Sequence, residues 1–189
     1  MVREVKMIKM LCVISLSSLL LSANVFSASV GENYFGASYH NGAYEEDGLS
    51  TLKPAGLSLK IGTYIADNVS LEGRFLFGLS SDDSSIFVPG FGVVDFEFEL
   101  DSAISLFLKG DIPISSSVNI YGIAGFTKAE FTVTVFDTTV SDDESGFSYG
   151  FGAEIAVDSD IFIAGEYIVY IDEDTYEYSG INIGFTKLF

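Results

Sequence analysis

The sequence predicts an all-β protein, an eight-stranded antiparallel up-and-down transmembrane β-barrel. Three observations support this fold. Apolar residues alternate with small or polar residues from residue 33 to the end, which is the period of a β-strand. Mean hydropathy is positive, at +0.38, although 27 of the 189 residues are acidic. Beyond residue 28 no window approaches 18 uninterrupted apolar residues, so the hydropathy is spread over short segments and not over helical spans.

The first 28 residues have the pattern of a cleavable export signal. Three basic residues precede an apolar run, and small residues surround the expected cleavage site after Ser27 or Ala28. We therefore assign residues 1–28 to a signal peptide and residues 29–189 to one barrel domain. Cys12 leaves with the signal, so the mature domain has no disulfide and no thiol chemistry.

The mature domain is strongly acidic. Of the 9 basic and 27 acidic residues, three basic and one acidic residue fall in the signal, so the domain carries a net charge of −20. Such a charge excludes nucleic-acid binding through phosphate neutralisation. A hydrophobic content of 48% and an aromatic content of 14% argue against disorder.

The first four predicted strands show the alternation clearly. Residues 35–40 alternate apolar side chains with glycine, serine and histidine, and residues 55–62 do so with glycine, serine and lysine. Residues 69–79 set leucine and phenylalanine against serine, glutamate and arginine. Residues 94–109 are the longest segment, with apolar residues from Val94 to Leu108 on one parity and mostly acidic residues on the other. Each pattern predicts a strand with one apolar face.

The last four predicted strands are more varied. Residues 118–135 change parity near Lys128, which predicts a β-bulge. Residues 147–155 alternate large apolar residues with glycine and serine, and residues 161–170 and 176–189 complete the set. Strands of about ten residues match the length of a tilted bilayer crossing.

The connections alternate between short and long. Compact turns are predicted at residues 66–68, 111–117 and 158–160. Longer or more acidic loops are predicted at residues 41–51, 80–92, 137–146 and 172–175. Outer-membrane barrels place short turns in the periplasm and long loops outside the cell.

A soluble barrel or sandwich is the alternative, because alternation shows only that one face of the sheet is apolar. The residues that alternate with the large apolar side chains decide between a soluble barrel and a membrane barrel. Residues 56–62 place glycine, serine and lysine there, and residues 148–154 place serine, glycine and glutamate. Small residues suit the crowded interior of a narrow barrel, which leaves the large apolar residues facing lipid.

Three segments resemble strands of the small bacterial outer-membrane barrels of the OmpA transmembrane domain and OmpX type: residues 69–78 (VSLEGRFLFG), 120–131 (IYGIAGFTKAEF) and 145–153 (SGFSYGFGA). The resemblance covers the whole mature chain and implies a location in the cell outer membrane. It also implies that Phe189 is the terminal aromatic residue read by the barrel assembly machinery. Lys187 departs from the apolar or aromatic residue usual two positions before the end.

Charged residues of both signs fall on the predicted inward parity. Charges in a narrow interior must be paired to offset the desolvation penalty, and three of each sign predict a lumenal ion-pair network. We expect this network to plug the barrel, and a gated ion path is the alternative. The predicted members are Lys60, Glu72, Arg74, Lys109, Glu154 and Glu166.

Most other acidic residues gather toward the loop end of the predicted barrel. We expect a solvated, repulsive rim, with calcium or magnesium bridging to lipopolysaccharide as the alternative. No twelve-residue calcium-loop spacing is present, so we predict no metal site and no cofactor. The residues are Glu45, Glu46, Asp47, Asp82, Asp83, Asp142, Asp143, Glu144, Asp172, Glu173 and Asp174, joined by the acidic ladder of residues 95–101.

The sequence offers no catalytic constellation. His40 is the only histidine, and we expect it at the outer end of the first strand. Ser38 lies two residues away on the same face, but a single serine and histidine do not make a convincing nucleophile and base. We predict no enzymatic activity and no catalytic residue.

The sequence therefore predicts a non-catalytic integral outer-membrane barrel with acidic extracellular loops. Its role is structural or surface interaction, through adhesion or contact with lipopolysaccharide. The alternative is a narrow porin-like channel for ions or small solutes. Expected partners are outer-membrane lipid, lipopolysaccharide, the assembly machinery and an extracellular ligand of the loops, and we expect a monomer.

Overall fold

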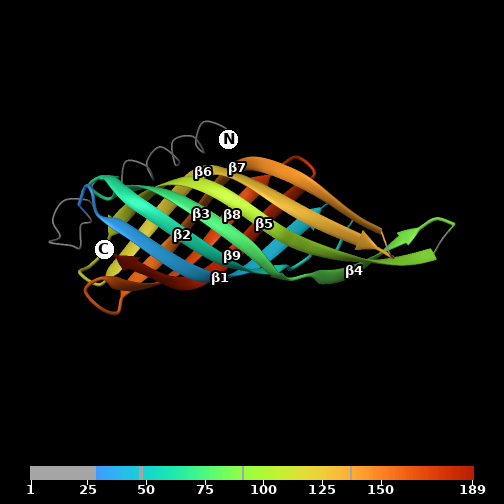
Figure 1. The fold of residues 1–189 in the computed structure, drawn as a ribbon, viewed down its shortest axis with the longest axis horizontal. Coiled ribbons are helices and arrows are strands. Elements are labelled where there is room, and N and C mark those ends of the chain that lie inside the picture. Colours follow the sequence, from blue (N-terminus) through green and yellow to red (C-terminus); the bar gives the residue numbers. More distant parts are fainter. Residues whose placement is uncertain (1–28, 47–48, 91, 137) are drawn as a thin grey trace, which may run out of the picture.

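The structure is a computed structural model that describes residues 29–46, 49–90, 92–136 and 138–189 (Figure 1). The predicted signal segment and Asp47 lie outside these residues. The described residues form nine β-strands: β1 Asn33–Glu46, β2 Ala55–Ala66, β3 Val69–Ser80, β4 Asp82–Val88, β5 Gly92–Pro113, β6 Val118–Val135, β7 Thr138–Ala156, β8 Ile161–Asp172 and β9 Tyr176–Leu188.

Eight of these strands close into a barrel. The hydrogen-bonded order runs from β3 through β2, β1, β9, β8, β7 and β6 to β5, and pairing between β3 and β5 closes the ring. All pairings are antiparallel. The predicted eight-stranded up-and-down barrel is confirmed. Closure pairs the ring strands on both sides, which satisfies the backbone of a sheet whose exterior is apolar.

The short turns share one end of the barrel, where the described N-terminal residues and the C-terminus also lie (Figure 1). Backbone hydrogen bonds join these turns to the ends of neighbouring strands. The Asp111 N–H donates to the Asn68 carbonyl at 2.8 Å, and the Leu188 N–H donates to the Asp160 carbonyl at 2.8 Å. Asn68 has a φ of 61°, which asparagine tolerates in a tight turn.

The opposite end carries a β-sheet where loops were expected. Residues 80–92 include β4, which forms a hairpin with the start of β5, and residues 138–146 belong to β7, which pairs with β6 as far as Val135 and Thr138. The loop predictions for these two segments are wrong. Their acidic and serine content suggested loops, but β-branched and aromatic residues support strands, and Gly90 and Gly92 supply the positive φ of a tight turn.

We call this projecting sheet the arm. It consists of β4, residues 92–100 of β5, residues 131–135 of β6 and residues 138–148 of β7. Figure 1 shows it extending beyond the ring, with the β4–β5 hairpin reaching furthest. The arm lies at the end opposite the short turns, as the alternation of short and long connections predicts.

A bulge in β5 reverses the facing of its arm-side half. The pairing with β6 shifts register between Leu100 and Ser102. Phe98 and Leu100 therefore lie inside, at 4% and 0% exposure, whereas Ile104 lies outside although it has the same sequence parity. The prediction that all these apolar residues share one face of the strand is wrong for the part before the bulge.

The parity change predicted near Lys128 is also wrong. β6 keeps one inward parity from Asn119 to Phe131, and its pairing with β7 is unbroken. What changes is the chemistry of each face. Outward residues are apolar up to Phe126 and polar from Lys128 onward, while the inward side changes from polar Thr127 to apolar Phe131. The strand therefore leaves the apolar part of the exterior at this level.

The barrel exterior carries an apolar belt. Every ring strand contributes exposed, outward-facing apolar residues to it, as expected where the surrounding solvent is lipid. One member from each strand, in chain order, is Phe35, Leu59, Phe75, Leu106, Phe126, Phe151, Ile163 and Ile183. The described part of the chain contains no helix long and apolar enough to cross a membrane.

Candidate functional site

The six charged residues expected to face the lumen are all buried, at 6% exposure or less. They come from β2, β3, β5, β7 and β8, and they form two clusters inside the barrel. Strand alternation brings them there, because each lies on the inward parity of its strand. The clusters centre on Arg74 and on Lys109.

Arg74 spans the lumen. Its Nη1 and Nη2 atoms lie 2.5 Å and 3.0 Å from the two carboxylate oxygens of Glu166. Its Nε donates to Glu72 on the same strand. The guanidinium also lies 5.1 Å from the ring centroid of Phe107. The two carboxylates hold the planar guanidinium in a fixed orientation, which a lysine could not reproduce.

Lys109 is the centre of the second cluster. Its Nζ lies 3.1 Å from Glu154 Oε2 and 3.0 Å from Asp111 Oδ1. Lys60 Nζ lies 4.0 Å from the other oxygen of Glu154. Asp111 was assigned to a turn, yet it continues the inward parity of Lys109 by two residues, and this signal could have identified it.

Tyrosines complete both clusters. The Tyr34 hydroxyl donates to Glu72 at 2.8 Å, and the Tyr121 hydroxyl donates to Glu166 at 2.7 Å. The Tyr64 hydroxyl donates to Asp111 at 2.9 Å. With Asp111 included, these clusters hold four carboxylates and three cations, so the tyrosine O–H groups offset the surplus of acceptors. The alternation pattern does not identify these tyrosines, because it assigns large aromatic residues to the lipid face.

Inward glycines make room for these tyrosines. A Cβ atom on Gly62 would lie 2.2 Å from the Tyr34 ring, and one on Gly152 would lie 2.5 Å from the Tyr121 ring. Both distances are below van der Waals contact. The small residues of the inward parity are therefore the complement of the large polar rings that fill the lumen.

His40 is fully buried inside the barrel, and it does not lie at the outer rim where the sequence suggested. Its Nδ1 lies 2.9 Å from Asn182 Oδ1, and its Nε2 lies 2.6 Å from the Tyr178 hydroxyl. Asn182 in turn donates to the Tyr170 hydroxyl at 3.0 Å. Both ring nitrogens are thus engaged by an amide and a phenol, so neither is directed at Ser38 as a base would be.

An aromatic cluster fills the arm-side half of the lumen. The rings of Phe98 and Phe131 stack at 5.4 Å, and Phe131 meets Tyr178 edge to face at 5.1 Å. The centroid of the Tyr44 ring lies 4.7 Å from that of Phe98 and 5.6 Å from that of Tyr176. This end of the molecule is built like a soluble β-protein, apolar inside and polar outside. The arm is therefore fixed to the barrel by a packed core.

Both faces of the arm carry acidic residues. Asp95, Glu97 and Glu99 follow one another on the outward side of β5, and Asp83 and Asp143 share this side. The acidic residues on the inward side, which pair opposite Phe98, Phe131 and Ala129, are Asp82, Asp142 and Glu144. Lys128, at the base of the arm, pairs with Asp143 at 2.9 Å. The described residues contain no group of three or more histidine, cysteine or acidic residues that could hold a metal ion.

Both edges of the arm are open. β4 pairs with β5 alone, and residues 138–145 of β7 pair with β6 alone, whereas Gly146 and Ser148 already lie against β8. Each edge presents backbone N–H and C=O groups in strand geometry. Such an edge is a template on which another extended chain can add.

Phe189 lies at the short-turn end. Its N–H donates to the Asn33 carbonyl at 2.9 Å, and its ring lies 6.0 Å from that of Phe35 on the barrel exterior. Lys187 pairs with Asp160 at 3.1 Å. This hydrophilic pairing accounts for the charged residue two positions before the end.

Comparisons with known proteins point in one direction. The family model described as outer membrane protein beta-barrel domain matches residues 13–189. The chain is similar to the crystal structure of Ail, the attachment invasion locus protein of Yersinia pestis, with a TM-score of 0.60, 19% identity, and coverage of 85% of this chain and 99% of that one. A comparison with curated protein sequences finds no match.

A second similar structure is Neisserial surface protein A. It has a TM-score of 0.65 and 14% identity, and the alignment covers 87% of this chain and 99% of that one. Ail in complex with the heparin analogue sucrose octasulfate is also similar, with a TM-score of 0.59, 18% identity, and coverage of 85% and 99%. At these identities the structural likeness shows the fold alone.

Proposed function

Because the chain belongs to the outer membrane protein beta-barrel domain family, we propose that it is a non-catalytic outer-membrane barrel that holds the acidic arm at the cell surface as an interaction element. The open strand edges of the arm carry this proposal. They are joined to a membrane anchor by the aromatic cluster, so a partner bound at an edge is held firmly to the cell.

The orientation follows from the two ends of the barrel. Outer-membrane barrels place short turns in the periplasm and longer connections outside. The arm then projects from the cell, and Phe189 lies on the periplasmic side, where we propose that the assembly machinery reads it. Residues 1–28 would direct export to that side.

The lumen favours an anchor over the porin-like channel. Arg74 and Glu166 bridge opposite walls, and the aromatic cluster lies above them. In an eight-stranded barrel the interior is only wide enough for side chains to fill. An ion crossing it would have to separate buried pairs, whose partners would be left without counter-charge.

The charge of the arm and the unpaired backbone groups at its edges together indicate the chemical class of the partner. Adding a strand to a sheet edge supplies affinity through main-chain hydrogen bonds, and side-chain contacts supply specificity. The acidic surface of the arm favours a basic segment and repels polyanions. We therefore propose an extended, basic peptide segment of another protein as the partner class, in an adhesive role. Contact with lipopolysaccharide is proposed for the belt of the barrel.

The test is binding of a short alternating lysine–valine peptide to the refolded protein in detergent micelles, measured by fluorescence anisotropy. We expect binding by the wild type, and about tenfold weaker binding when Asp95→Asn, Glu97→Gln and Glu99→Gln are combined. A peptide that carries an N-methyl group on every second residue should bind weakly, because the methylated nitrogens along one side of the extended peptide cannot donate hydrogen bonds to the arm.

The matched control is an alternating glutamate–valine peptide of the same length. Equal binding of the two peptides, or full binding of the N-methylated peptide, would contradict the proposed recognition. The triple variant removes only charge from the exposed side of β5, so its far-UV circular dichroism should equal that of the wild type.

A further inference from the structure

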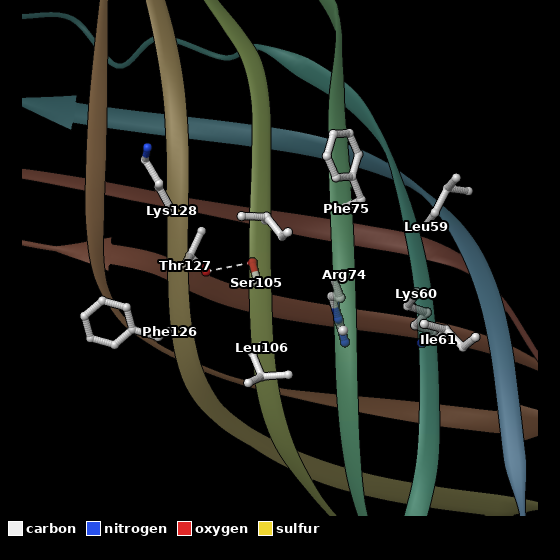
Figure 2. Close-up of a pocket in the computed structure, with 12 residues that line it drawn as sticks. Leu59, Lys60, Ile61, Arg74, Phe75, Ser105, Leu106, Phe126, Thr127 and Lys128 are labelled. Atoms are coloured by element: carbon white, nitrogen blue, oxygen red, sulfur yellow. Dashed lines mark hydrogen bonds between the residues drawn. The ribbon is translucent and has the colours of Figure 1, made fainter.

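A groove of about 660 Å³ runs along the outward wall of β2, β3, β5 and β6. Figure 2 shows this wall, with Lys128, Phe75 and Leu59 on the arm side and Phe126, Leu106 and Ile61 on the other side. The Ser105 and Thr127 hydroxyls, joined by a dashed line, belong to the inward parity. The apolar lining consists of Leu59, Ile61, Phe75, Ile104, Leu106 and Phe126.

The strand register explains the shape of the groove. One cross-strand row joins Ile61, Gly73, Leu106 and Phe126, and the row on its arm side joins Leu59, Phe75, Ile104 and Lys128. Every position of the first row carries a large apolar side chain except Gly73. The missing side chain leaves the floor of the groove at this point.

No local constraint requires a glycine at position 73. A Cβ atom there would meet nothing within 4 Å, and Gly73 is not among the glycines with positive φ. Gly62 and Gly152 are different, because tyrosine rings occupy the space beside them. Packing inside the barrel therefore does not require Gly73. The space that it leaves open lies outside the barrel, in the apolar belt.

Lys128 stands at the arm-side rim of this groove. It is the first polar residue after Phe126 on the outward face of β6, and Glu130 follows it. This change marks the level at which the exterior leaves the hydrocarbon, so the ammonium lies at the depth of lipid head groups. Lys60, Arg74 and Lys109 are buried in the lumen, and Lys187 lies at the short-turn end. Lys53 is exposed beside Asp82 of β4 and does not line the groove.

The ion pair of Lys128 leaves it available for a ligand. Lys128 Nζ lies 2.9 Å from Asp143, but the two side chains are 58% and 57% exposed. Exposed pairs of this kind contribute little to stability. An ammonium has three N–H donors, so a phosphate can bind beside the carboxylate.

We propose that the groove holds an acyl chain of lipopolysaccharide, with a phosphate of its lipid A anchor bound to Lys128. The apolar groove and the cation at its rim match the two chemical parts of this lipid. The inference rests on the proposed orientation, which places Lys128 in the outer leaflet.

A second groove on the exterior provides the control. It has a volume of about 620 Å³ and includes the outward glycines Gly122 and Gly165. Its lining, which includes Phe151, Tyr167 and Ile181, contains no basic residue. A Cβ atom on Gly165 would also meet nothing within 4 Å. Gly73→Leu and Gly165→Leu are therefore equivalent changes in two grooves, of which one has a cation.

The experiment is native mass spectrometry of the refolded protein in detergent micelles, titrated with lipid A and with dephosphorylated lipid A. We expect the wild type to retain lipid A in preference to the dephosphorylated form. Lys128→Gln should lower the affinity for lipid A about tenfold and abolish the preference, since a charge-assisted contact is lost. Gly73→Leu should weaken binding of both lipids.

Gly165→Leu should bind both lipids as the wild type does, and circular dichroism of each variant checks that the barrel has formed. An equal effect of Gly73→Leu and Gly165→Leu, or an unchanged lipid preference in Lys128→Gln, would overturn the site. The measurement is made in micelles and does not involve the arm. A negative result for lipid A binding is therefore distinct from a negative result for peptide binding. The lipid A site and the peptide-binding function can each be contradicted while the other stands.

Discussion

Arg74 and Glu166 form a bidentate ion pair between strands that lie diametrically opposite each other in the ring. Their nitrogen–oxygen distances are 2.5 Å and 3.0 Å, and the two residues are 92 positions apart in the sequence. β3 and β8 are separated by the same number of strands in either direction around the barrel. The pair is therefore a strut across the lumen, and its loss should affect both stability and closure.

The first prediction concerns the stability of this strut. Arg74→Ala should lower the free energy of unfolding by about 3 to 5 kcal/mol, because Glu72 and Glu166 are left buried without their cation. Combining Arg74→Ala with Glu166→Gln should recover part of the loss. Urea unfolding in lipid vesicles, followed by circular dichroism, gives the double-mutant cycle. Strictly additive losses would show that the two side chains do not interact.

The second prediction concerns the apolar belt. Leu59→Arg or Phe151→Arg should lower the free energy of unfolding by roughly 2 to 4 kcal/mol near the bilayer midplane, since the charge enters hydrocarbon. Asp95→Arg, on the exposed side of the arm, is the control and should change it by less than about 0.5 kcal/mol. The same urea titration in vesicles measures all three. A neutral result at both belt positions would mean that these side chains do not face lipid.

The third prediction concerns the aromatic cluster. Phe131→Ala should lower the free energy of unfolding by about 3 to 5 kcal/mol, because its ring packs against Phe98 and Tyr178 in a buried site. The loss should be local to the base of the arm. Hydrogen exchange should quicken in residues 92–100 and 131–135 more than at the short-turn end. Uniformly faster exchange throughout the ring would argue against a separate packed core at that end.

The fourth prediction concerns orientation. Asp95→Cys lies on the arm and Ser116→Cys lies in a short turn, and the predicted mature domain has no other cysteine. On intact cells a membrane-impermeant maleimide should label the first variant and not the second. Permeabilised cells should allow both to react. Labelling of Ser116→Cys alone on intact cells would invert the barrel.

Much of the ring could be predicted from alternation. Five of the six inward charges share a parity with glycine or serine, the exception being Glu166, so burial of Glu72 or Lys109 follows from strand geometry once the strand is recognised. The three short turns could be predicted for a related reason, because asparagine, aspartate, serine and proline cluster in these short stretches between apolar strands. These signals are local in sequence, and antiparallel pairing of consecutive strands preserves them in the fold.

The arm could not be predicted in the same way. Residues 80–92 and 137–146 are rich in acidic and serine residues, which suggested loops, yet pairing with β5 and β6 stabilises Asp82–Val88 and residues 138–146 as strands. The reversal at Leu100 depends on a bulge that no residue type marks. Beyond Phe126 the apolar face moves from outside to inside, because the surrounding solvent changes from lipid to water. The alternation of residues shows which side chains share a face of the strand, but not whether that face meets lipid or water.

The most direct test of the closed lumen is single-channel conductance of the refolded wild-type protein in planar bilayers. The buried ion pairs and the aromatic cluster predict only rare, small openings. The double variant with Arg74→Ala and Phe131→Ala should open more often, because it weakens both the buried ion pairs and the aromatic cluster that close the lumen. Sustained conductance by the wild type, unchanged in the double variant, would contradict the closed barrel and favour the porin-like channel.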